Sequence, residues 1–405
     1  MLENRVKQII DDVVMRQDAA LIDYTEKFDH VTLGKQDLRI TSEEIEESYR
    51  RVSEDQISAI ESMKRRVETL EKQTLNCAET EIETDGFRVR TLSRPIESVG
   101  CYVPGGEASY PSTLVMAATP AKLAKVSRVV ICSPPTEQGT INSLTLVAAD
   151  ICEVDEIYKV GGVQAIAALA YGTESIKPVR KIVGPGNKYV TMAKALVSRD
   201  IAIDMPAGPS EVLILADETA DPRFVALDMV SQAEHSADSI AGLITTSEEL
   251  AKKVINELQG IVPSARRGAI ITRALSNQGF MVICRSTEEM VDLANDFSPE
   301  HIEILTREPK QVANKISTAG LILTGPYSPV SASDYCFGTN HILPTGGFGR
   351  TYSGLSVLDF VRRVGVVECS RNGLAKLRNN AKILAEAENL PNHFAAIEGR
   401  FEYED

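Results

Sequence analysis

The sequence has 405 residues, of which 43% are hydrophobic and 25% are charged. A chain of this length is expected to form two or more domains, each with its own hydrophobic core. The formal net charge of −14 and the absence of any basic cluster exclude a nucleic-acid backbone as partner. No apolar run reaches transmembrane length, and the N-terminus lacks the apolar core of a signal peptide, so no membrane partner is expected.

Seven cysteines stand singly along the chain, at positions 77, 101, 132, 152, 284, 336 and 369. An odd, unclustered set is typical of free thiols and gives no cysteine-based zinc site. We therefore expect a protein of the reducing cytoplasm.

Residues 1–75 have the pattern of helices. Val6, Ile9, Ile10 and Val13 recur at the spacing of one helix face. The segment Thr41-Ser42-Glu43-Glu44 has the pattern of a capping box, which predicts the start of a second, long and highly charged helix.

From about Arg88 onward, short apolar runs alternate with helical patterns. Strands are predicted at 98–103, 128–133, 156–160, 180–184, 211–216, 241–246, 281–286, 301–305 and 320–324. Helices are predicted at 112–124, 143–152, 164–171 and 188–198, and a further helix opens at Asp221-Pro222 and ends near His235. Repeated strand–helix units imply parallel sheets with helices on both faces.

The alternation divides into two α/β segments, at about 100–210 and 211–325. The stretch from Gly325 to Gly354 is rich in Gly, Pro and Ser, and so long an irregular segment is usually functional or disordered. The last fifty or so residues are expected to return to helix.

Four side chains of the types that bind metals occur in polar surroundings. Gln232 and His235 lie three apart on a predicted helix, so we expect them to share one face. Asp334 lies in the Gly-rich segment, and His393 lies near the end of a C-terminal helix. Together they offer nitrogen and oxygen ligands that suit zinc, with manganese or cobalt tolerated. The alternatives are a hydrogen-bonded surface pair, a turn-forming aspartate and a frayed helix end.

Glu300 and His301 stand where a turn enters a predicted strand. A neutral histidine accepts a proton near pH 7, and a glutamate can position or deprotonate water, so the pair suits acid–base chemistry. The alternative is a Pro-initiated turn with solvated charges. His341 in the Gly-rich segment offers a further contact for substrate or metal, and Glu388 stands close to His393.

Three Gly-rich turns each follow a predicted strand and precede a helix. They are YVPGG (102–106), VGGVQ (160–164) and GPGN (184–187). Backbone N–H groups at such positions can meet a phosphate, although none of the three matches G-x-G-x-x-G. Glycine also simply permits tight turns, so the pattern alone is a weak signal.

The ordered set of motifs resembles the histidinol dehydrogenase family from about Arg5 to His393, nearly the whole chain. The motifs are YVPGG with YPST downstream, KIVGPGNKYV, DMPAGPSEVL, SQAEH, SPEHIE, SDY followed by GTNHILPTGG, and SGLSVLDF. The resemblance implies zinc-dependent oxidation of L-histidinol through L-histidinal to L-histidine, the last step of histidine biosynthesis, with reduction of two NAD+. It also implies one zinc per subunit and a homodimer whose C-terminal segment completes the neighbouring active site.

The fold implied is α/β, with two incomplete Rossmann-like parallel-sheet domains and helical extensions at both termini. We expect an N-terminal helical extension at 1–30 and a first α/β domain, on the substrate and zinc side, at 31–101 and 211–355. The second α/β domain, which binds NAD, is expected at 102–210. The C-terminal helical segment, 356–405, is expected to contact the partner subunit.

The resemblance also assigns roles to single residues. The zinc ligands would be Gln232, His235, Asp334 and His393. His301 would be the general base, and Glu300 would activate water in the second step. Substrate contacts would come from Ser210, Gln232, His235, His301, Asp334, His341, Glu388 and His393, and NAD contacts from Tyr102, Gln164 and Asn187.

Three other functions stay open at this point. A related zinc- and NAD-dependent alcohol dehydrogenase acting on dihydroxypropanesulfonate would need Arg or Lys beside the metal, whereas the acidic Glu388 suits a cation. A zinc hydrolase would use Glu300 and His301 on a zinc-bound water, without NAD. A metal-stabilised binding protein would bind its ligand without turnover.

Overall fold

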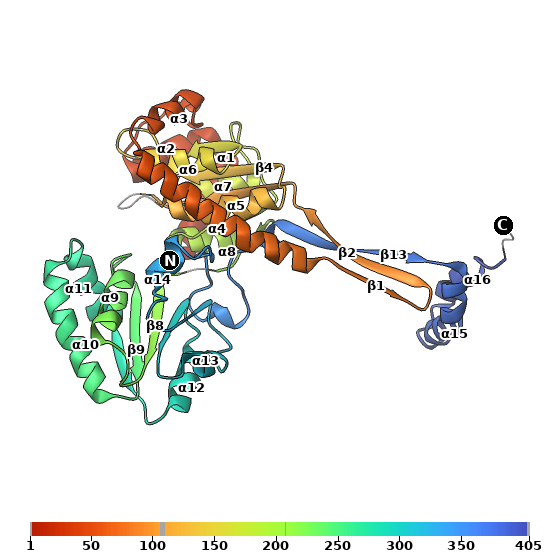
Figure 1. Cartoon of the computed structure of the whole chain (residues 1–405). Coiled ribbons are helices and arrows are strands. Elements are labelled where there is room, and N and C mark those ends of the chain that lie inside the picture. Colours follow the sequence, from red (N-terminus) through yellow and green to blue (C-terminus); the bar gives the residue numbers. More distant parts are fainter. Residues whose placement is uncertain (1, 106–109, 207, 403–405) are drawn as a thin grey trace. The chain divides into compact units, whose positions relative to one another are not determined.

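The structure is a computed structural model that describes residues 2–105, 110–206 and 208–402 (Figure 1). Gly106 of YVPGG and Ala207 of DMPAGPSEVL lie outside the described residues. The chain forms a larger unit, Met1–Lys72 with Ile96–Phe360, and a smaller unit, Gln73–Pro95 with Val361–Asp405. In the described part of the chain, no helix combines the length and the apolar character needed to cross a membrane.

Five parallel strands form the first sheet of the larger unit, in the order β5-β4-β3-β6-β7. They are β3 (Ser98–Tyr102), β4 (Arg128–Ser133), β5 (Glu156–Lys159), β6 (Lys181–Val183) and β7 (Ala202–Ile203). The chain starts at the central β3, runs outward to β5 and then crosses back to β6. Such a reversal opens a crevice at the carboxyl edge, between the loops that follow the two central strands.

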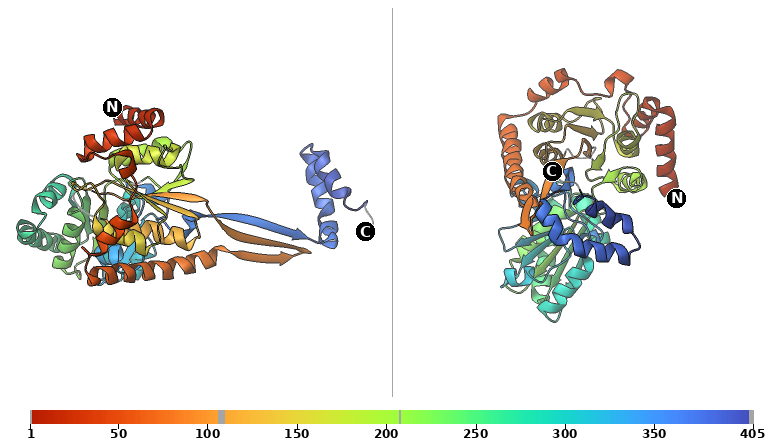
Figure 2. Two further views of the ribbon diagram at one scale, coloured as in Figure 1. Left: turned by 90° about the horizontal axis from the view of Figure 1, so that it is seen from above. Right: turned by 90° about the vertical axis from the view of Figure 1, so that its right-hand side faces the viewer.

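Helices cover both faces of this sheet. Helices α5 (Pro111–Leu123) and α6 (Ser143–Ile151) pack on one face, and α7 (Gly162–Tyr171) and α8 (Lys188–Val197) pack on the other. Helices α1 (Leu2–Arg16) and α2 (Asp18–Asp29) add a further layer on the side of α7 (Figure 2). The predicted apolar stripe of α1 accounts for this layer, because Val6, Ile10 and Val13 are buried in the same core.

The capping box at Thr41 forms as predicted. The Glu44 N–H donates to Thr41 Oγ1, and the Thr41 N–H donates to the Glu44 carboxylate. The helix that follows, α3 (Ser42–Tyr49), is short, so the prediction of one long helix is wrong. A second box explains the break: the Ser53 N–H donates to the Gln56 side chain, and the Gln56 N–H to Ser53 Oγ, just before α4 (Glu54–Ala78).

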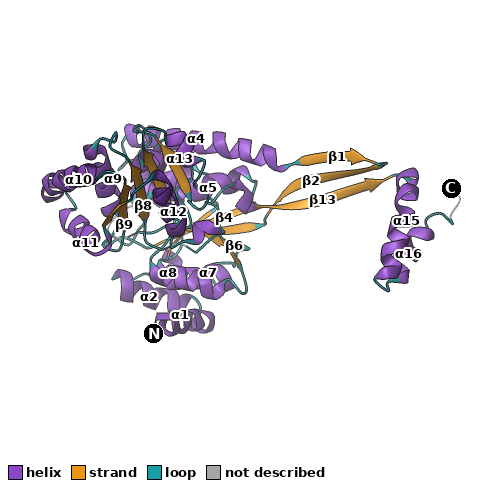
Figure 3. Ribbon diagram, turned by 90° about the horizontal axis from the view of Figure 1, so that it is seen from below, coloured by secondary structure: helices purple, strands orange, loops and turns teal. Residues whose placement is uncertain are grey.

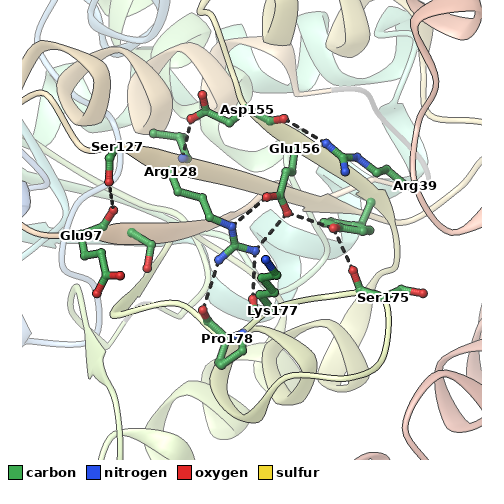
Figure 4. A network of polar contacts seen from close by, with 12 residues as sticks. Arg39, Glu97, Ser127, Arg128, Asp155, Glu156, Ser175, Lys177 and Pro178 are labelled. Atoms are coloured by element: carbon green, nitrogen blue, oxygen red, sulfur yellow. Dashed lines mark hydrogen bonds and ion pairs between the residues drawn. The ribbon is translucent and has the colours of Figure 1, made fainter.

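At its amino edge, the first sheet is tied together by charged side chains (Figure 4). Arg128 donates through Nε and Nη2 to the two carboxylate oxygens of Glu156 at 2.8 and 3.0 Å, which joins β4 to β5. The same guanidinium donates to the carbonyls of Lys177 and Pro178, in the loop before β6. One guanidinium thus joins β4, β5 and the loop before β6 at this edge.

The second sheet of the larger unit is also parallel, in the order β10-β9-β8-β11-β12. Its strands are β8 (Glu211–Ala216), β9 (Ile240–Thr245), β10 (Phe280–Ile283), β11 (His301–Leu305) and β12 (Leu321–Thr324). The confirmed fold class is therefore α/β with two parallel five-stranded sheets. As in the first sheet, the earliest strand is central and the order reverses beside it.

Side chains of β8 alternate between two layers of helices. Figure 1 labels helices of both layers. Val212 and Ile214 pack toward α9 (Pro222–Ala233) and α10 (Glu248–Ile261), and α11 (Gly268–Gln278) lies beside these helices. Leu213 and Leu215 pack toward α12 (Thr287–Phe297) and α13 (Pro309–Ala313). The strand is buried on both faces, which is why its sequence is a continuous apolar run after Glu211.

The smaller unit contains a three-stranded antiparallel sheet of order β1-β2-β13, followed by two helices (Figure 3). The elements are β1 (Thr80–Thr84), β2 (Phe87–Pro95), β13 (Val361–Cys369), α15 (Arg371–Ala387) and α16 (Pro391–Glu398). A two-residue turn of Asp85 and Gly86, with φ of 48° and 86°, joins β1 to β2. The expectation of helix from residue 356 onward is wrong over 361–369, where recurring valines favour a strand.

Candidate active site

Glu300 and His301 lie at the amino end of β11. Helix α12 ends at Ser298, whose left-handed φ of 55° turns the chain into the strand. His301 pairs with Val212 of β8, so Glu300 stands beside Glu211, the first residue of that strand. Both predicted catalytic side chains are buried, with exposed fractions of 7% for Glu300 and 3% for His301.

Glu211 and Glu300 bind each other's backbone. The Glu211 N–H donates to Glu300 Oε2 at 2.8 Å, and the Glu300 N–H donates to Glu211 Oε2 at 3.3 Å. The Gly346 N–H donates to the other oxygen of Glu211 at 3.0 Å. Burial, reinforced by the nearby charge of Glu300, raises the pKa of Glu211 to about 7. A carboxyl group that titrates near neutral pH therefore lies next to the candidate base.

The imidazole of His301 contacts the protein through Nδ1, whereas Nε2 has no hydrogen-bond partner among the described residues. Its Nδ1 lies 3.3 Å from the Glu211 carbonyl oxygen and 3.6 Å from Glu300 Oε2. A carbonyl can only accept, so Nδ1 carries the proton and Nε2 of the neutral ring has a lone pair. Nε2 is buried and has no hydrogen-bond partner among the described residues. Burial lowers the pKa of His301, but the charge and hydrogen bond of Glu300 outweigh it, and the net shift is upward.

The Gly-rich segment brings Asp334 and His341 together. Asp334 lies on α14 (Val330–Tyr335), and its carbonyl oxygen is 3.3 Å from His341 Nδ1. His341 Nε2 lies 3.3 Å from Thr113 Oγ1 on α5. Asn340 also donates to the Met116 carbonyl of α5 at 2.9 Å, so this segment joins the second α/β segment to the first. Burial lowers the pKa of His341, which favours the neutral ring.

Gln232 and His235 are placed differently from each other. Gln232 is buried in the last turn of α9, whereas His235 lies beyond the end of that helix and is exposed. The prediction that both share a helix face is therefore corrected. The His235 N–H donates to the Gln232 carbonyl at 3.3 Å, and the Ser236 N–H donates to Ser239 Oγ, so the chain turns here and does not continue the helix.

The candidate metal ligands come from both units. Helix α14, with Asp334, packs against α9, with Gln232. Burial foremost, and then the negative charges of Asp334 and Glu234, raise the pKa of Tyr335 at the end of α14. Amide, carboxylate and imidazole donors form a set that suits zinc. No cluster of three or more His, Cys, Asp or Glu with metal-binding geometry occurs among the described residues.

Two predicted site residues belong to the smaller unit. Glu388 follows the last turn of α15, and His393 lies in the first turn of α16, which begins at Pro391. Both side chains are exposed. The structure therefore places these two residues outside the unit that contains Glu300 and His301.

The three predicted NAD contacts lie at the carboxyl edge of the first sheet. Tyr102 ends β3, and its hydroxyl accepts the Gly162 N–H at 3.1 Å. Gln164, in the first turn of α7, is buried and its Oε1 has no partner in the described residues. Asn187 caps α8 by accepting two backbone N–H groups. The unpartnered Gln164 oxygen and a cavity of about 1330 Å³ at the same edge fit a bound nucleotide.

The GPGN turn has an internal support that sequence reasoning missed. Gly184 has a φ of +113°, and a Cβ there would lie 2.1 Å from the Tyr102 carbonyl oxygen. Its N–H donates to Asp204 at 2.7 Å, its carbonyl accepts from Lys194 Nζ at 2.8 Å, and Lys194 pairs with Asp204. Two sequence signals indicate this buried pair. Lys194 lies in a helix with an apolar face, and Asp204 precedes a turn that contains Pro and Gly.

Ser210 and Glu211 begin the second α/β segment. Ser210 is partly buried, and its carbonyl accepts the Ile240 N–H at 2.9 Å. The sequence predicts Glu211 only as the start of a strand, and its contacts with Glu300 and His301 emerge from the structure. Its signal is a single acidic residue at the head of an otherwise apolar buried run, where an unpaired charge is costly.

Comparisons with known proteins agree along nearly the whole chain. The family model described as histidinol dehydrogenase matches residues 1–401. A histidinol dehydrogenase of Methanocaldococcus jannaschii is 46% identical over 98% of this chain and 91% of its own. One from Listeria monocytogenes is 43% identical over 100% of this chain and 94% of its own.

Solved structures show the same relationship. The crystal structure of histidinol dehydrogenase from Elizabethkingia anophelis is 39% identical, with a TM-score of 0.95, and the match covers 99% of this chain and 92% of that one. An acetylating aldehyde dehydrogenase from Geobacillus thermoglucosidasius, at 14% identity and a TM-score of 0.52, is alike in fold alone. The chain belongs to the histidinol dehydrogenase family, whose members are NAD-dependent oxidoreductases acting on a CH–OH group.

Proposed function

We propose that the protein oxidises L-histidinol through L-histidinal to L-histidine in the cytoplasm, reducing two NAD+, as the last step of histidine biosynthesis. The observation that carries the proposal is the buried imidazole of His301, whose Nε2 has no partner in the described residues while Nδ1 is held by a carbonyl. A histidine held in this way can accept the proton of an alcohol. Membership of the family supplies the substrate.

In the first step, His301 Nε2 takes the hydroxyl proton of the substrate, and the hydride on the carbinol carbon would pass to NAD+. Glu300 lies 3.6 Å from the same ring and stabilises the imidazolium that results. His301 then releases its proton to solvent. In the second step, Glu300 removes a proton from the water that adds to the aldehyde carbon and returns it to the carbonyl oxygen, which gives the hydrate. Neutral His301 accepts a hydroxyl proton of the hydrate, whose hydride would pass to a second NAD+. The burial of both side chains limits competing water.

Gln232, His235 and Asp334, with His393 of a second subunit in a homodimer, would hold one zinc ion per subunit. Zinc, when bound, would orient the imidazole and amine of histidinol. Ser210, His341 and Glu388 would complete the substrate contacts, and a carboxylate at Glu388 suits the cationic amine. Tyr102, Gln164 and Asn187 would contact NAD at the carboxyl edge of the first sheet. The donor types and the packing of α14 on α9 support this assignment.

An NADH assay with histidinol, run with and without a zinc chelator, tests the proposal. We expect two NADH per histidinol, with activity lost on chelation and restored by zinc. No NADH from histidinol would overturn it. NADH from dihydroxypropanesulfonate alone would favour the related alcohol dehydrogenase, and hydrolytic turnover without NAD would favour the zinc hydrolase.

A further inference from the structure

A pair of carboxyl groups, Asp228 on α9 and Glu303 on β11, lies within the second α/β segment. Glu303 stands in the middle of a buried strand and is only 1% exposed, although its side chain is a carboxyl group. Its Oε1 accepts the N–H of Val330, the first residue of α14, at 2.6 Å. No donor among the described residues reaches its Oε2. The neighbouring carboxyl group of Asp228 forms a side-chain hydrogen bond with Glu303 when one of the two groups is protonated.

Asp228, Glu303 and the Val330 N–H that Glu303 binds each lie a few residues along the chain from a candidate site residue. Asp228 precedes Gln232 by four residues on α9, so the two lie one turn apart on the same side of the helix. Glu303 follows His301 by two residues on β11, so both point to the same face of the sheet. That face is the one toward α9, because Leu305 packs in the core with residues of that helix.

Val330, whose N–H donates to Glu303, lies on the same helix as the candidate ligand Asp334. Val330 precedes Asp334 by four residues on α14, again about one helical turn. A single carboxyl pair therefore joins the three elements that present His301, Gln232 and Asp334. Helix α14 is short, and the Glu303 carboxyl group satisfies the N–H of its first residue, which has no partner within the helix.

The charge state of the pair follows from its surroundings. Burial and then the charge of Asp228 raise the pKa of Glu303, and burial raises the pKa of Asp228. The two groups influence each other, and no cation among the described residues forms an ion pair with either. Because two adjacent buried carboxylates cannot both ionise at low cost, they share a proton, held on Glu303.

We propose that Asp228 and Glu303 are positioning residues that fasten α9 and α14 to β11 and thereby present Gln232 and Asp334 together to the metal. The proposal rests on the proposed function, because it takes Gln232 and Asp334 as zinc ligands. Neither carboxyl group touches substrate or cofactor in this scheme. They act by setting the positions of the ligands, as the partners behind metal ligands commonly do.

The test compares zinc affinity in three variants of the full-length protein, measured by competition with a chelating indicator. Glu303→Leu removes the acceptor for Val330 and leaves Asp228 unpaired, and should weaken zinc binding by about 10–100-fold. Glu303→Gln keeps an acceptor for Val330 and a donor for Asp228, and should restore affinity to near the wild-type value. Asp221→Ala is the control: it removes the N-cap of the same helix α9, so it lowers the melting temperature without touching the pair.

The outcomes distinguish the positioning role of Asp228 and Glu303 from the assignment of the zinc ligands. Weak zinc binding in Glu303→Leu, with tight binding in Glu303→Gln and Asp221→Ala, supports the positioning role. Wild-type affinity in Glu303→Leu overturns it, and so does an equal loss in Asp221→Ala at a matched fall in melting temperature. If instead Asp334→Asn binds zinc as tightly as the wild type, the zinc assignment itself is wrong, whatever Glu303→Leu does.

Discussion

Glu211 and Glu300 each donate a backbone N–H to the other's carboxylate, at 2.8 and 3.3 Å, across the first rung of two parallel strands. This exchange fixes the point at which β8 and β11 begin. Because the Glu211 carbonyl also meets His301 Nδ1, the same residue sets the position of the candidate base. The geometry of the catalytic pair thus depends on a residue that takes no part in the chemistry.

Glu211 should make stability depend on pH. Its pKa is raised to about 7 from an ordinary 4.5, so the folded state holds the proton more tightly than the unfolded state. The resulting stabilisation is fully present below about pH 4.5 and is lost as pH rises through about 7. In the wild type, the free energy of unfolding should therefore fall by up to roughly 3 kcal/mol over this pH range, and Glu211→Gln should remove that fall. Urea unfolding at several pH values measures it; equal pH profiles for the variant and the wild type would contradict the prediction.

Replacing Glu300 should separate the two oxidation steps. Glu300→Gln keeps an acceptor for the Glu211 N–H but cannot take a proton from water. We expect the first hydride transfer to survive and the second to slow by about 10²–10⁴-fold. The measurement is the number of NADH formed per histidinol, which should fall from two toward one while aldehyde accumulates.

His301→Asn is the matched comparison for that experiment. It removes the base needed in both steps, so the burst of a first NADH should disappear as well. If Glu300→Gln and His301→Asn gave the same loss at both steps, the division of roles between the two residues would be wrong.

A homodimer that shares its sites predicts complementation. His393→Asn and His301→Asn should each be inactive alone, since one lacks a zinc ligand and the other lacks the base. If His393 comes from the partner subunit, one of the two sites in each mixed dimer is intact. Refolding the two variants together should restore up to about a quarter of the wild-type activity, for random pairing and one site in two. Failure of mixed dimers to recover activity would place the whole ligand set within one chain.

Gly184→Ala should weaken NAD binding. The added Cβ would lie 2.1 Å from the Tyr102 carbonyl oxygen, and the φ of +113° is unfavourable for alanine. The KM for NAD should rise more than that for histidinol, because the turn belongs to the cofactor side. Gly260→Ala is the control, since a Cβ at that position in α10 meets nothing within 4 Å and should leave both KM values unchanged.

Much of the α/β fold was predictable because the central strands of the two sheets, such as β3, β4, β8 and β11, are buried on both faces. The apolar runs at 128–133 and 211–216 match β4 and β8 to the residue. Strand β13 was missed because its side chains are largely exposed, so its sequence, VRRVGVVEC, has no continuous apolar run. The break between α3 and α4 depends on the second capping box, at Ser53 and Gln56, which an apolar pattern does not reveal.

The candidate site was predictable where a residue lies in a distinctive motif. Glu300 and His301 were expected at the entry of a strand and lie there. The supporting carboxyls were not predicted, because Glu211 and Glu303 act through backbone N–H groups that come from distant parts of the chain, Gly346 and Val330 among them. Such contacts depend on tertiary packing, which local sequence does not specify.

His301 begins its strand, so the candidate base stands at the amino edge of the second sheet, whereas most α/β enzymes use the carboxyl edge of their sheets. None of the candidate site residues lies in the turns that directly follow the strands at the carboxyl edge of this sheet. In the turn between β8 and α9, Glu218 and Thr219 are exposed, and they lie at the opposite end of β8 from Glu211. These turns are natural attachment points for a fluorescent label or an affinity tag, by which zinc loading and dimer exchange can be followed in the working enzyme.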